Sequence, residues 1–325
     1  MLLLRRQWLF GNFASKKLML HLLLASLLLL MELNCENLFD SSHDEGKHDT
    51  EFLPEGARRW TSQRYHHKLR QIARTILSVA EPPALVALCE VENDSVMHHL
   101  THHGMLRNLD YGYFITSSAD VRGIDVALMY QPYKFRPIRH ITFRVDVGRS
   151  QRPTRDILYV CGRVESGDTL HVLVVHAPSR ANKGKAGERQ RIKVSRRVTE
   201  VTDSIRACSP DAHIVVMGDF NATADEASLH CMQQRQLHHV SAQATGSHGA
   251  LGTYRFRGKW EHIDHIFVSQ PLLPKVNRAY IADAPFLLEP EPKYGGVRPA
   301  RVFMGAKYNK KGVSDHLPLV LTLTY

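Results

Sequence analysis

The chain has 325 residues, of which 43% are hydrophobic and 23% are charged. This composition excludes a disordered chain, which would be poorer in apolar residues, and a polytopic membrane protein, which would be richer. Lys and Arg total 42 against 32 Asp and Glu, so the formal charge is +10. That excess suits a polyanionic partner such as nucleic acid, a phosphoester or an anionic lipid surface, and it equally suits a charge that serves solubility alone.

The N-terminal segment has the pattern of a leader. An apolar run from Leu18 to Met31 follows four basic residues, Arg5, Arg6, Lys16 and Lys17. Such a run is short for a membrane span but suits the core of a signal peptide. We therefore expect residues 1–30 to be a signal peptide or anchor and the protein to be exported. The alternative is a misassigned start, with a cytoplasmic protein that begins near Met31.

Predicted helices and strands alternate over 31–325, and no linker divides this region, so we expect a single domain. The spacing of apolar residues predicts helices over 58–79, 94–105 and 188–206. Short apolar runs predict strands over 84–89, 124–130, 157–164, 171–175, 213–217, 263–268 and 317–324. The pattern indicates sheets covered by helices, without choosing among the folds of that kind.

Polar residues follow apolar strands in five segments of the chain. The segments are ELNCEN (32–37), LCEVEN (88–93), HAPSR (176–180), GDFN (218–221), and the pair IDH (263–265) with SDH (314–316). Acids and amides are costly to bury at strand ends unless they are paired or bound to a cation. Oxygen ligands without cysteine select a hard ion such as Mg²⁺, Mn²⁺ or Ca²⁺. A divalent ion among carboxylates, with a His–Asp pair for proton transfer, is equipment for hydrolysing a phosphate ester.

Two of these segments repeat one pattern. ALVALCEVEN and HIVVMGDFNA each run as an apolar strand, then a carboxylate, then Asn. The repeat predicts that Glu90 and Asp219 lie at strand ends, where they can converge on a shared cleft. Asp125 lies within an apolar strand instead, and we expect it to make a structural hydrogen bond.

Seven motifs in order resemble the endonuclease/exonuclease/phosphatase superfamily, the deoxyribonuclease I and exonuclease III-like fold, and in particular its bacterial, often exported members. They are NCENLFD, RGIDVALMY, RPTRDILYV, VVHAPSR, GDFNA, GTYRFRGKWEHIDHIFVS and SDHLPLVL. The resemblance covers roughly residues 31–325. It implies a single α+β domain built as a four-layer α/β/β/α sandwich, with the site at one end of two packed sheets. It also implies metal-dependent hydrolysis of phosphodiesters or phosphomonoesters.

The resemblance assigns catalytic roles to five residues. Asp219 matches the acid that orients or activates the attacking water, and Asn221 matches the amide that steadies the pentacovalent phosphorus. Asp264 matches the acid that orients the catalytic histidine. His316 matches that histidine, as general base or phosphate stabiliser, and His176 matches a histidine near the leaving oxygen.

The remaining assignments concern metal and substrate. The implied metal is Mg²⁺, with Mn²⁺ as an alternative and Ca²⁺ as a structural ion. Its matched ligands are Asn34, Glu36, Glu90 and Asp315. Contacts to the substrate fall on Arg155, which matches a phosphate-contacting arginine loosely, and on Arg180 and Tyr254.

Histidines invite a second metal argument. His98, His99, His102 and His103 form two pairs four residues apart on one predicted helix, a geometry able to chelate a transition metal. We expect a solvated helix face there, with any binding adventitious, because the carboxylate second shell of established sites is lacking.

These observations favour a nuclease, since HAPSR, GDFNA and SDH resemble the deoxyribonuclease side of the family and the chain is basic. A basic segment after HAPSR would then lie beside a polymer substrate, and it contains Lys183, Lys185, Arg189, Arg191, Lys193, Arg196 and Arg197. The alternative enzyme is a small-molecule phosphoesterase acting on inositol phosphates or sphingomyelin-like lipids. A non-catalytic module binding nucleic acid or phospholipid is disfavoured, because every matched position is filled. We expect a monomer with no obligate protein partner, and membrane contact only through the leader.

Overall fold

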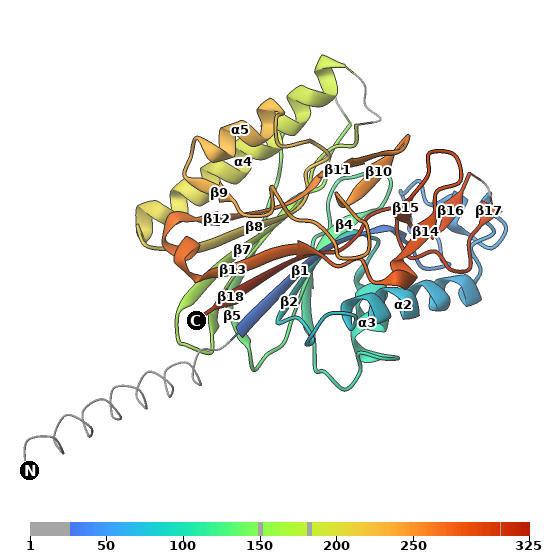
Figure 1. Ribbon diagram of the computed structural model, residues 1–325, viewed down its shortest axis with the longest axis horizontal. Coiled ribbons are helices and arrows are strands. Elements are labelled where there is room, and N and C mark those ends of the chain that lie inside the picture. Colours follow the sequence, from blue (N-terminus) through green and yellow to red (C-terminus); the bar gives the residue numbers. More distant parts are fainter. Residues whose placement is uncertain (1–26, 149–151, 181–183, 306) are drawn as a thin grey trace, which may run out of the picture.

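Two six-stranded sheets pack face to face in the computed structural model, which describes residues 27–148, 152–180, 184–305 and 307–325 (Figure 1). The first sheet has the order β13 (Val276–Ile281), β18 (Leu319–Thr324), β1 (Leu27–Leu38), β2 (Leu85–Val91), β4 (Asp125–Tyr130) and β3 (Gly112–Ile115). The second has the order β5 (Phe135–Phe143), β6 (Ile157–Val164), β7 (Thr169–His176), β8 (His213–Asp219), β12 (Asp264–Ser269) and β9 (Leu237–His239).

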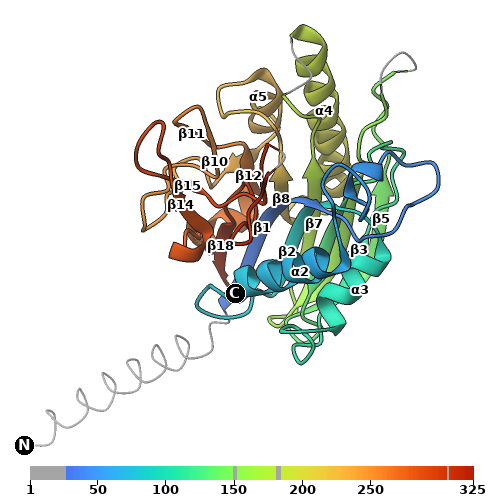
Figure 2. The same ribbon diagram turned by 90° about the vertical axis from the view of Figure 1, so that its right-hand side faces the viewer.

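Helices cover both outer faces of this sandwich. On the first sheet lie α2 (Ser62–Ile76) and α3 (Asp94–His102), and on the second lie α4 (Lys185–Cys208) and α5 (Ala227–Gln233) (Figure 2). The arrangement is the four-layer α/β/β/α sandwich that the resemblance implied. Within the described residues, no helix is long and apolar enough to cross a membrane.

Smaller elements decorate the ends of the sheets. Three hairpins are formed by β10 (Tyr254–Phe256) with β11 (Lys259–Glu261), β14 (Leu288–Pro290) with β15 (Val297–Pro299), and β16 (Phe303–Met304) with β17 (Lys307–Tyr308). Short 3-10 helices span Thr50–Phe52, Gln270–Lys275 and Pro285–Leu287. The hairpin β10–β11 is the one that reaches the site described below.

Alternation along the strands divides the apolar residues between two cores. In β8, Val215 and Met217 point into the space between the sheets, whereas Ile214 and Val216 belong to the core under α4 and α5. This period of two is what a strand buried on both faces requires. The expected apolar runs are therefore strands at the centre of each sheet, and Asp125 accepts hydrogen bonds from Thr116 and Ser118 as predicted.

The first strand corrects the predicted boundary of the domain at residue 30. Leu28, Leu29 and Leu30 are buried within β1, where Leu27–Leu30 pair with β18. An apolar stretch suits the core of a leader and a central strand equally well, so composition could not separate the two. Residues 1–26 of the predicted leader lie outside the described residues. The folded domain includes β1 from Leu27 onward.

A chain that starts at Met31 should therefore fold poorly. It would lose three buried leucines, each worth about 1.5–3 kcal/mol, together with their ladder hydrogen bonds to β18. We expect a chain of residues 31–325 to be unfolded, or less stable than 27–325 by more than about 4 kcal/mol. Urea unfolding followed by circular dichroism measures the difference. Equal stability of the two chains would support a start at Met31.

Candidate active site

The sheet topology brings the predicted residues to one edge of both sheets. β1 runs parallel to β2 and β7 runs parallel to β8, so the carboxyl ends within each pair lie side by side. β12 is antiparallel to β8, and its first residue, Asp264, pairs with Asp219. β18 is antiparallel to β1, which places His316, three residues before that strand, at the same edge. Six strands thus supply one site.

A cleft of about 550 Å³ opens at this edge. Nine of the twelve predicted site residues line it: Asn34, Glu36, Glu90, Arg180, Asp219, Asn221, Tyr254, Asp315 and His316. The other three, His176, Asp264 and Arg155, are buried. His176 and Asp264 contact residues that line the cleft, whereas Arg155 lies behind it and contacts Asp120 and the backbone of Ala177.

Asp219 is held from three directions. Asn34 Nδ2 donates to its Oδ2 at 2.9 Å, and Asn221 Nδ2 donates to the same oxygen at 3.1 Å. The backbone N–H of Asn221 donates to Oδ1 at 2.8 Å. Burial and the nearby charge of Asp264 raise the pKa of Asp219 to about 7. The carboxyl group is therefore fixed in place and poised to exchange a proton near neutral pH.

Asn34, one of the predicted metal ligands, makes two side-chain hydrogen bonds within the site. Its side-chain oxygen accepts the N–H of Glu36 at 2.9 Å, while its amide nitrogen donates to Asp219. Asn34 thus ties β1 to β8 and orients Asp219. Its side-chain oxygen accepts a single N–H and keeps a second lone pair, so these contacts are compatible with the predicted ligand role.

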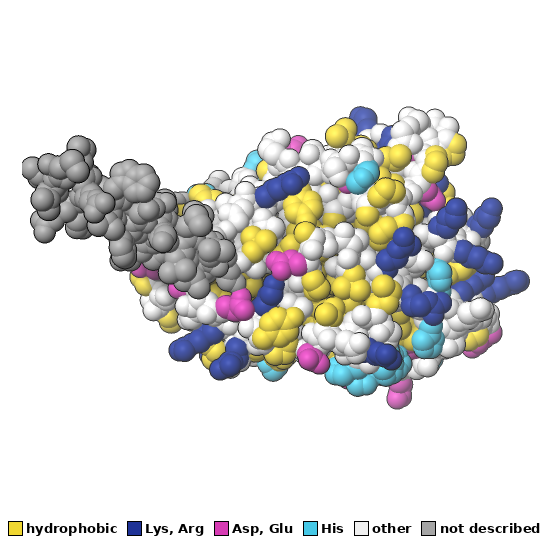
Figure 3. All heavy atoms as spheres, turned by 60° about the horizontal axis from the view of Figure 1, so that its bottom comes forward, with side chains coloured by type: hydrophobic (Ala, Val, Ile, Leu, Met, Phe, Trp, Pro, Cys, Tyr) yellow, Lys and Arg dark blue, Asp and Glu magenta, His cyan; other side chains and the backbone are white. Residues whose placement is uncertain are grey.

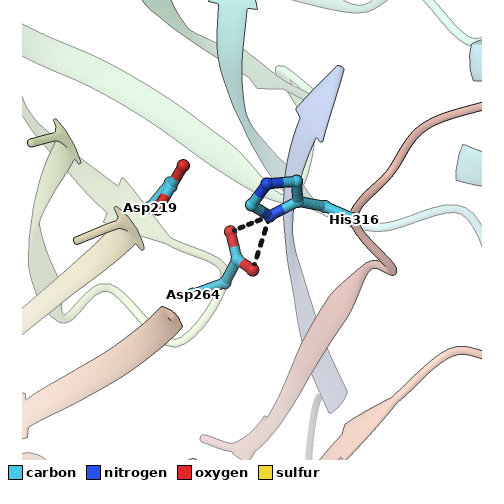
Figure 4. Close-up of side chains that lie close together, drawn as sticks. All are labelled: Asp219, Asp264 and His316. Carbon is cyan, nitrogen blue, oxygen red and sulfur yellow. Dashed lines mark hydrogen bonds and ion pairs between the residues drawn. The ribbon is translucent and has the colours of Figure 1, made fainter. Parts of the chain in front are cut away.

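His316 and Asp264 form the expected pair. His316 Nδ1 lies 2.8 Å and 3.0 Å from the two oxygens of Asp264, and the other ring nitrogen points away from that carboxylate (Figure 4). Burial lowers the pKa of His316, but the charge of Asp264 and its hydrogen bonds outweigh burial, so the pKa lies well above its ordinary value. At neutral pH the imidazole is therefore protonated and presents Nε2–H to the cleft.

His176 and Glu90 occupy the opposite side of Asp219. His176 Nε2 lies 3.6 Å from Asp219 Oδ2 and 3.9 Å from Glu90 Oε1. Burial, and the positive charges of Arg155 and Arg122, hold the pKa of His176 well below its ordinary value. This imidazole is neutral, so the two histidines of the site differ in charge.

Glu36 and Asp315 lie together at a third side. Glu36 Oε2 accepts the N–H of Val302 at 2.7 Å, and Asp315 Oδ2 accepts from Arg301 Nη2 at 2.6 Å. Burial and the charge of Asp315 raise the pKa of Glu36 to about 7. Lys68 lies beneath, with Nζ donating to the carbonyl oxygens of Val313 and Glu36.

The donor set fits a hard divalent cation. Glu36, Glu90 and Asp315 line the same cleft as Asp219, and two of these carboxyl groups have raised pKa values because negative charge is crowded and buried. A divalent cation offsets such crowding, and carboxylate oxygens are the ligands it prefers. Ligand atoms of Asp219, Asp264 and His316 also lie within 4.8 Å of one another. The predicted ligands Glu36, Glu90 and Asp315 would hold the cation from the wall of this cleft, where their ligand atoms are less closely grouped than those of Asp219, Asp264 and His316.

Backbone strain concentrates at this edge. Four of the eight non-glycine residues with positive φ in the described chain belong to the site: Glu36 (51°), Asn37 (59°), Glu90 (62°) and Asn221 (49°). Each such conformation costs free energy and persists where its surroundings hold it. Here the backbone N–H groups of Glu36, Asn37 and Asn221 donate to carboxylate or amide oxygens of the site. The strain turns these side chains toward the cleft.

Arg155 was predicted to contact the substrate, but in the structure it does not line the cleft. It is 6% exposed, and its Nη1 donates to Asp120 Oδ2 at 2.9 Å while Nη2 donates to the carbonyl of Ala177 at 2.6 Å. The same carbonyl accepts from Asn221. Arg155 therefore supports the loop after β7 from below, because a guanidinium buried in this way already has charged and polar partners.

Arg155→Ala should cost stability. Breaking a buried pair leaves the Asp120 carboxylate uncompensated, which costs about 3–5 kcal/mol. Arg180 provides the comparison, because it lines the cleft and its ion pair with Glu261 is partly exposed. Arg180→Ala should change the free energy of unfolding by less than about 1 kcal/mol and act on KM instead. Urea denaturation of both variants measures this. A stable Arg155→Ala enzyme with a raised KM would restore the substrate role.

Sequence reasoning missed several residues of the site, among them Arg122 and Phe256. Arg122 Nη2 donates to Asn37 Oδ1 at 2.6 Å and Nη1 lies 3.9 Å from Glu90 Oε1, so Arg122 links two of the strained residues. Its position within the quoted motif RGIDVALMY was the available signal. Phe256 lines the cleft from β10 and is 50% exposed, and its position within the motif GTYRFRGKWEHIDHIFVS was the corresponding signal.

The basic segment after HAPSR contributes less charge to the cleft than expected. Arg191 pairs with Glu226, Lys193 donates to the carbonyl of Val147, and Arg197 pairs with Glu200. Lys185 and Arg189 are exposed at the start of α4. Lys183 lies outside the described residues.

Solved structures with this fold include several members of the same superfamily. An endonuclease/exonuclease/phosphatase family protein from Bacteroides thetaiotaomicron has 17% identity and a TM-score of 0.59, covering 93% of this chain and 98% of its own. The mannosyl-6-phosphatase of that organism has 16% identity and a TM-score of 0.61, covering 92% and 100%. D. rerio TDP2, complexed with a single-strand DNA product, has 13% identity and a TM-score of 0.56, covering 92% and 99%. No curated protein is recognisably similar in sequence.

The fold and the site together define a protein of the deoxyribonuclease I-like class, with acids, amides and a His–Asp pair at one end of a sandwich. The family model described as Endonuclease/Exonuclease/phosphatase family matches residues 30–325. This chain belongs to that family, as the seven motifs predicted. Its members are in general hydrolases of phosphate esters.

Proposed function

We propose that this protein is a divalent-metal-dependent nuclease that hydrolyses phosphodiesters by attack of water. The observation that carries the proposal is that Asp219 and His316, which line one cleft, differ in the state of their acid–base groups. Burial and charge raise the pKa of Asp219 to about 7, and the Asp264 pair keeps His316 protonated. A base and a cation facing the same space are what water attack on a phosphate ester requires.

Each side chain then has a definite task. Asp219 accepts a proton from the attacking water, since a carboxylate with a pKa near neutrality is an effective base. His316 donates from Nε2 to a phosphoryl oxygen and stabilises the charge that develops there. Asn221 holds Asp219 through its backbone N–H and side chain. When bound by Glu36, Glu90 and Asp315, the cation neutralises charge on the phosphate.

The walls of the cleft support a nucleotide substrate. Tyr254 and Phe256 lie on β10 beside Arg180, so aromatic faces stand next to a cation at the mouth of the site. Bases stack on exposed aromatic side chains and phosphates meet arginine in many proteins that bind single strands. The DNA product bound to the structurally similar TDP2 is consistent with this choice.

A sugar-phosphate monoesterase is the second candidate. Three residues of the basic segment after HAPSR, Arg191, Lys193 and Arg197, contact Glu226, the carbonyl of Val147 and Glu200. This leaves less positive charge available beside the cleft. The similar fold of a mannosyl-6-phosphatase supports this alternative. An aromatic side chain such as Phe256 can pack against a sugar ring as well as a base.

Substrate panels and salt dependence distinguish the two candidates. The purified chain with Mg²⁺ or Mn²⁺ is tested on single-stranded, duplex and abasic DNA, on RNA, and on sugar phosphates. For a nuclease, Lys185→Ala/Arg189→Ala should raise KM for DNA and flatten its salt dependence, because fewer counterions are released. Hydrolysis of a small model diester should stay nearly unchanged. Unchanged DNA kinetics across the salt series, with faster turnover of sugar phosphates, would favour the monoesterase.

Export through the predicted leader remains part of this proposal. The basic residues and apolar run before β1 motivate it. Fractionation of the native organism with mass spectrometry of the mature N-terminus tests it. A cytosolic protein with an intact Met1 would argue against export.

A further inference from the structure

Histidines gather on the face of the molecule covered by α2 and α3, away from the cleft. The space-filling view shows histidine side chains along this face (Figure 3). The sequence placed His98, His99, His102 and His103 here, and the structure adds His66 from α2. The ring centroid of His99 lies 6.3 Å from that of His66 and 5.3 Å from that of His103.

Three of these imidazoles share one pocket. His66, His99 and His103 line a pocket of about 140 Å³ between the helices. Its remaining wall is largely apolar, with Leu69, Ala73 and Leu100, and it also contains Arg70. His98 and His102 are not part of it, since their rings stack on each other 4.4 Å apart on the exposed side of α3.

A backbone carbonyl fixes the orientation of His66. Its Nδ1 lies 2.8 Å from the carbonyl oxygen of Ser62, one turn earlier in α2. Because a carbonyl oxygen only accepts, Nδ1 must carry the proton and donate it. The lone pair of the neutral ring is therefore on Nε2, the atom through which histidine binds a metal in this tautomer.

A tyrosine hydroxyl contacts the corresponding ring nitrogen of His99. Tyr65 is 3% exposed, and its hydroxyl lies 2.8 Å from His99 Nδ1. Metal binding through Nε2 requires that Nδ1–H donate to the phenol oxygen, one of the two directions in which this hydrogen bond can run. Metal-binding histidines almost always have such a partner on the second ring nitrogen. The partners of these two rings are a backbone carbonyl and a phenol of α2, in place of the carboxylates of established sites.

We propose that His66, His99 and His103 bind a transition-metal ion such as Zn²⁺ between α2 and α3, at a site separate from the cleft. Around a tetrahedral ion with Zn–N distances near 2 Å, ring centroids lie roughly 5 Å apart. The observed separations from His99 are 5.3 Å and 6.3 Å, and binding requires the side chains to rotate until their nitrogens converge on the ion. His103 follows the last residue of α3 and is exposed, so its ring is free to make that movement.

The ligand chemistry separates this ion from the hydrolytic one. Imidazole nitrogens select borderline ions such as Zn²⁺, Cu²⁺ and Ni²⁺, whereas the carboxylates of the cleft select Mg²⁺ or Mn²⁺. Burial and the neighbouring histidines lower the pKa of His99, which favours the neutral form that binds metal. Protonated imidazoles in this cluster repel one another, whereas neutral imidazoles can bind one ion together.

An ion here would fasten the helix that supports the cleft. Lys68 follows Tyr65 by one turn of α2, and its ammonium donates to the carbonyls of Val313 and Glu36. Joining α2 to α3 through His66 and His99 therefore stabilises the element on which Glu36 rests. The site is structural and makes no contact with the reacting groups.

Zinc titration of the full chain tests the proposal. The chain is stripped with a chelator, desalted and titrated with Zn²⁺ by calorimetry in excess Mg²⁺, which occupies the carboxylate cleft. We expect one equivalent of Zn²⁺ to bind with micromolar or tighter affinity. His99→Ala and His103→Ala should abolish this binding, and Tyr65→Phe should weaken it about 10–100-fold by removing the orienting hydroxyl. Co²⁺ in place of Zn²⁺ should give the visible absorption of a four-coordinate ion.

Matched variants decide the interpretation. His98→Ala removes a neighbouring exposed histidine outside the pocket and should leave the affinity unchanged, and Glu90→Gln should do so too. Should His99→Ala fail to fold, His103→Ala at the exposed helix end carries the test. Equal losses in His98→Ala and His103→Ala, or binding no tighter than millimolar, would reduce the cluster to adventitious chelation by a helix face. Loss of the zinc equivalent in Glu90→Gln would place the ion in the cleft and overturn the proposal.

Discussion

His316→Ala is expected to lower kcat by about 10²–10⁴-fold, the usual contribution of a positioned proton donor or acceptor. The pair with Asp264 supplies the reason. The carboxylate holds Nδ1 at 2.8 Å and 3.0 Å, so Nε2–H is fixed in direction and the ring stays charged. Steady-state kinetics on the substrate identified by the panel measures the loss. Circular dichroism checks that the variant is folded.

Non-additivity tests whether the two residues act as a unit. Asp264→Ala alone should be severe, yet in the His316→Ala background it should add little, since the charge it orients is already gone. The pair His248–Asp283 is a matched control, with Nδ1 and Oδ1 3.2 Å apart and the histidine half exposed outside the cleft. His248→Ala should leave kcat unchanged. Fully additive losses at His316 and Asp264 would mean that they act separately.

Removal of the divalent cation is expected to abolish hydrolysis, and Mg²⁺ or Mn²⁺ to restore it. Glu90→Gln should raise the Mg²⁺ concentration needed for half-maximal rate by at least about 10–100-fold, the loss seen even for residues that only support a ligand. The substitution keeps the shape of the side chain and the hydrogen bond from Asn37, while it removes the charge. A magnesium titration of the rate measures the shift.

Glu92→Gln is the control for this experiment. Burial raises the pKa of Glu92 to about 9, so the residue is neutral at pH 7 and glutamine replaces it without a change of charge. Its carboxyl group accepts the N–H of Asp40 and does not line the cleft, so metal dependence should be unaltered. Full activity in chelator would remove the metal from the proposed mechanism. Rescue by Zn²⁺ alone would direct attention to histidine ligands.

The secondary structure was predictable where burial on both faces made strands wholly apolar. Over 157–164 the expected strand coincides with β6, the strand expected at 213–217 ends two residues later as β8, and the one expected at 84–89 begins one residue and ends two residues later as β2. β5 and β13 were not predicted, because these strands carry Arg residues on exposed positions and show no apolar run. The helix expected over 58–79 is shorter in the structure and begins at Ser62, after the Thr61 cap.

Local pattern also failed where one composition serves two structures. Leu27–Leu30 form a buried strand, yet the same residues fit the end of a leader core. Arg155 carries a charge that fits a phosphate contact, yet its partners are Asp120 and a backbone carbonyl. In each case the deciding contact comes from residues far along the chain, and the local sequence does not encode it.

What the sequence by itself determined was the chemistry of the site. Acids, amides and histidines are costly to bury after apolar strands, which marked the segments with Glu90, Asp219, Asn221, Asp264 and His316, and the resemblance of the ordered motifs to one family supplied the expected roles. Only the tertiary structure decided the protonation behaviour of these residues. Asp219 and His316 differ in proton affinity because burial and neighbouring charges act through space across β8, β12 and the segment before β18. The same holds for the histidines on α2 and α3, whose pocket and orienting partners exist only once the two helices pack together.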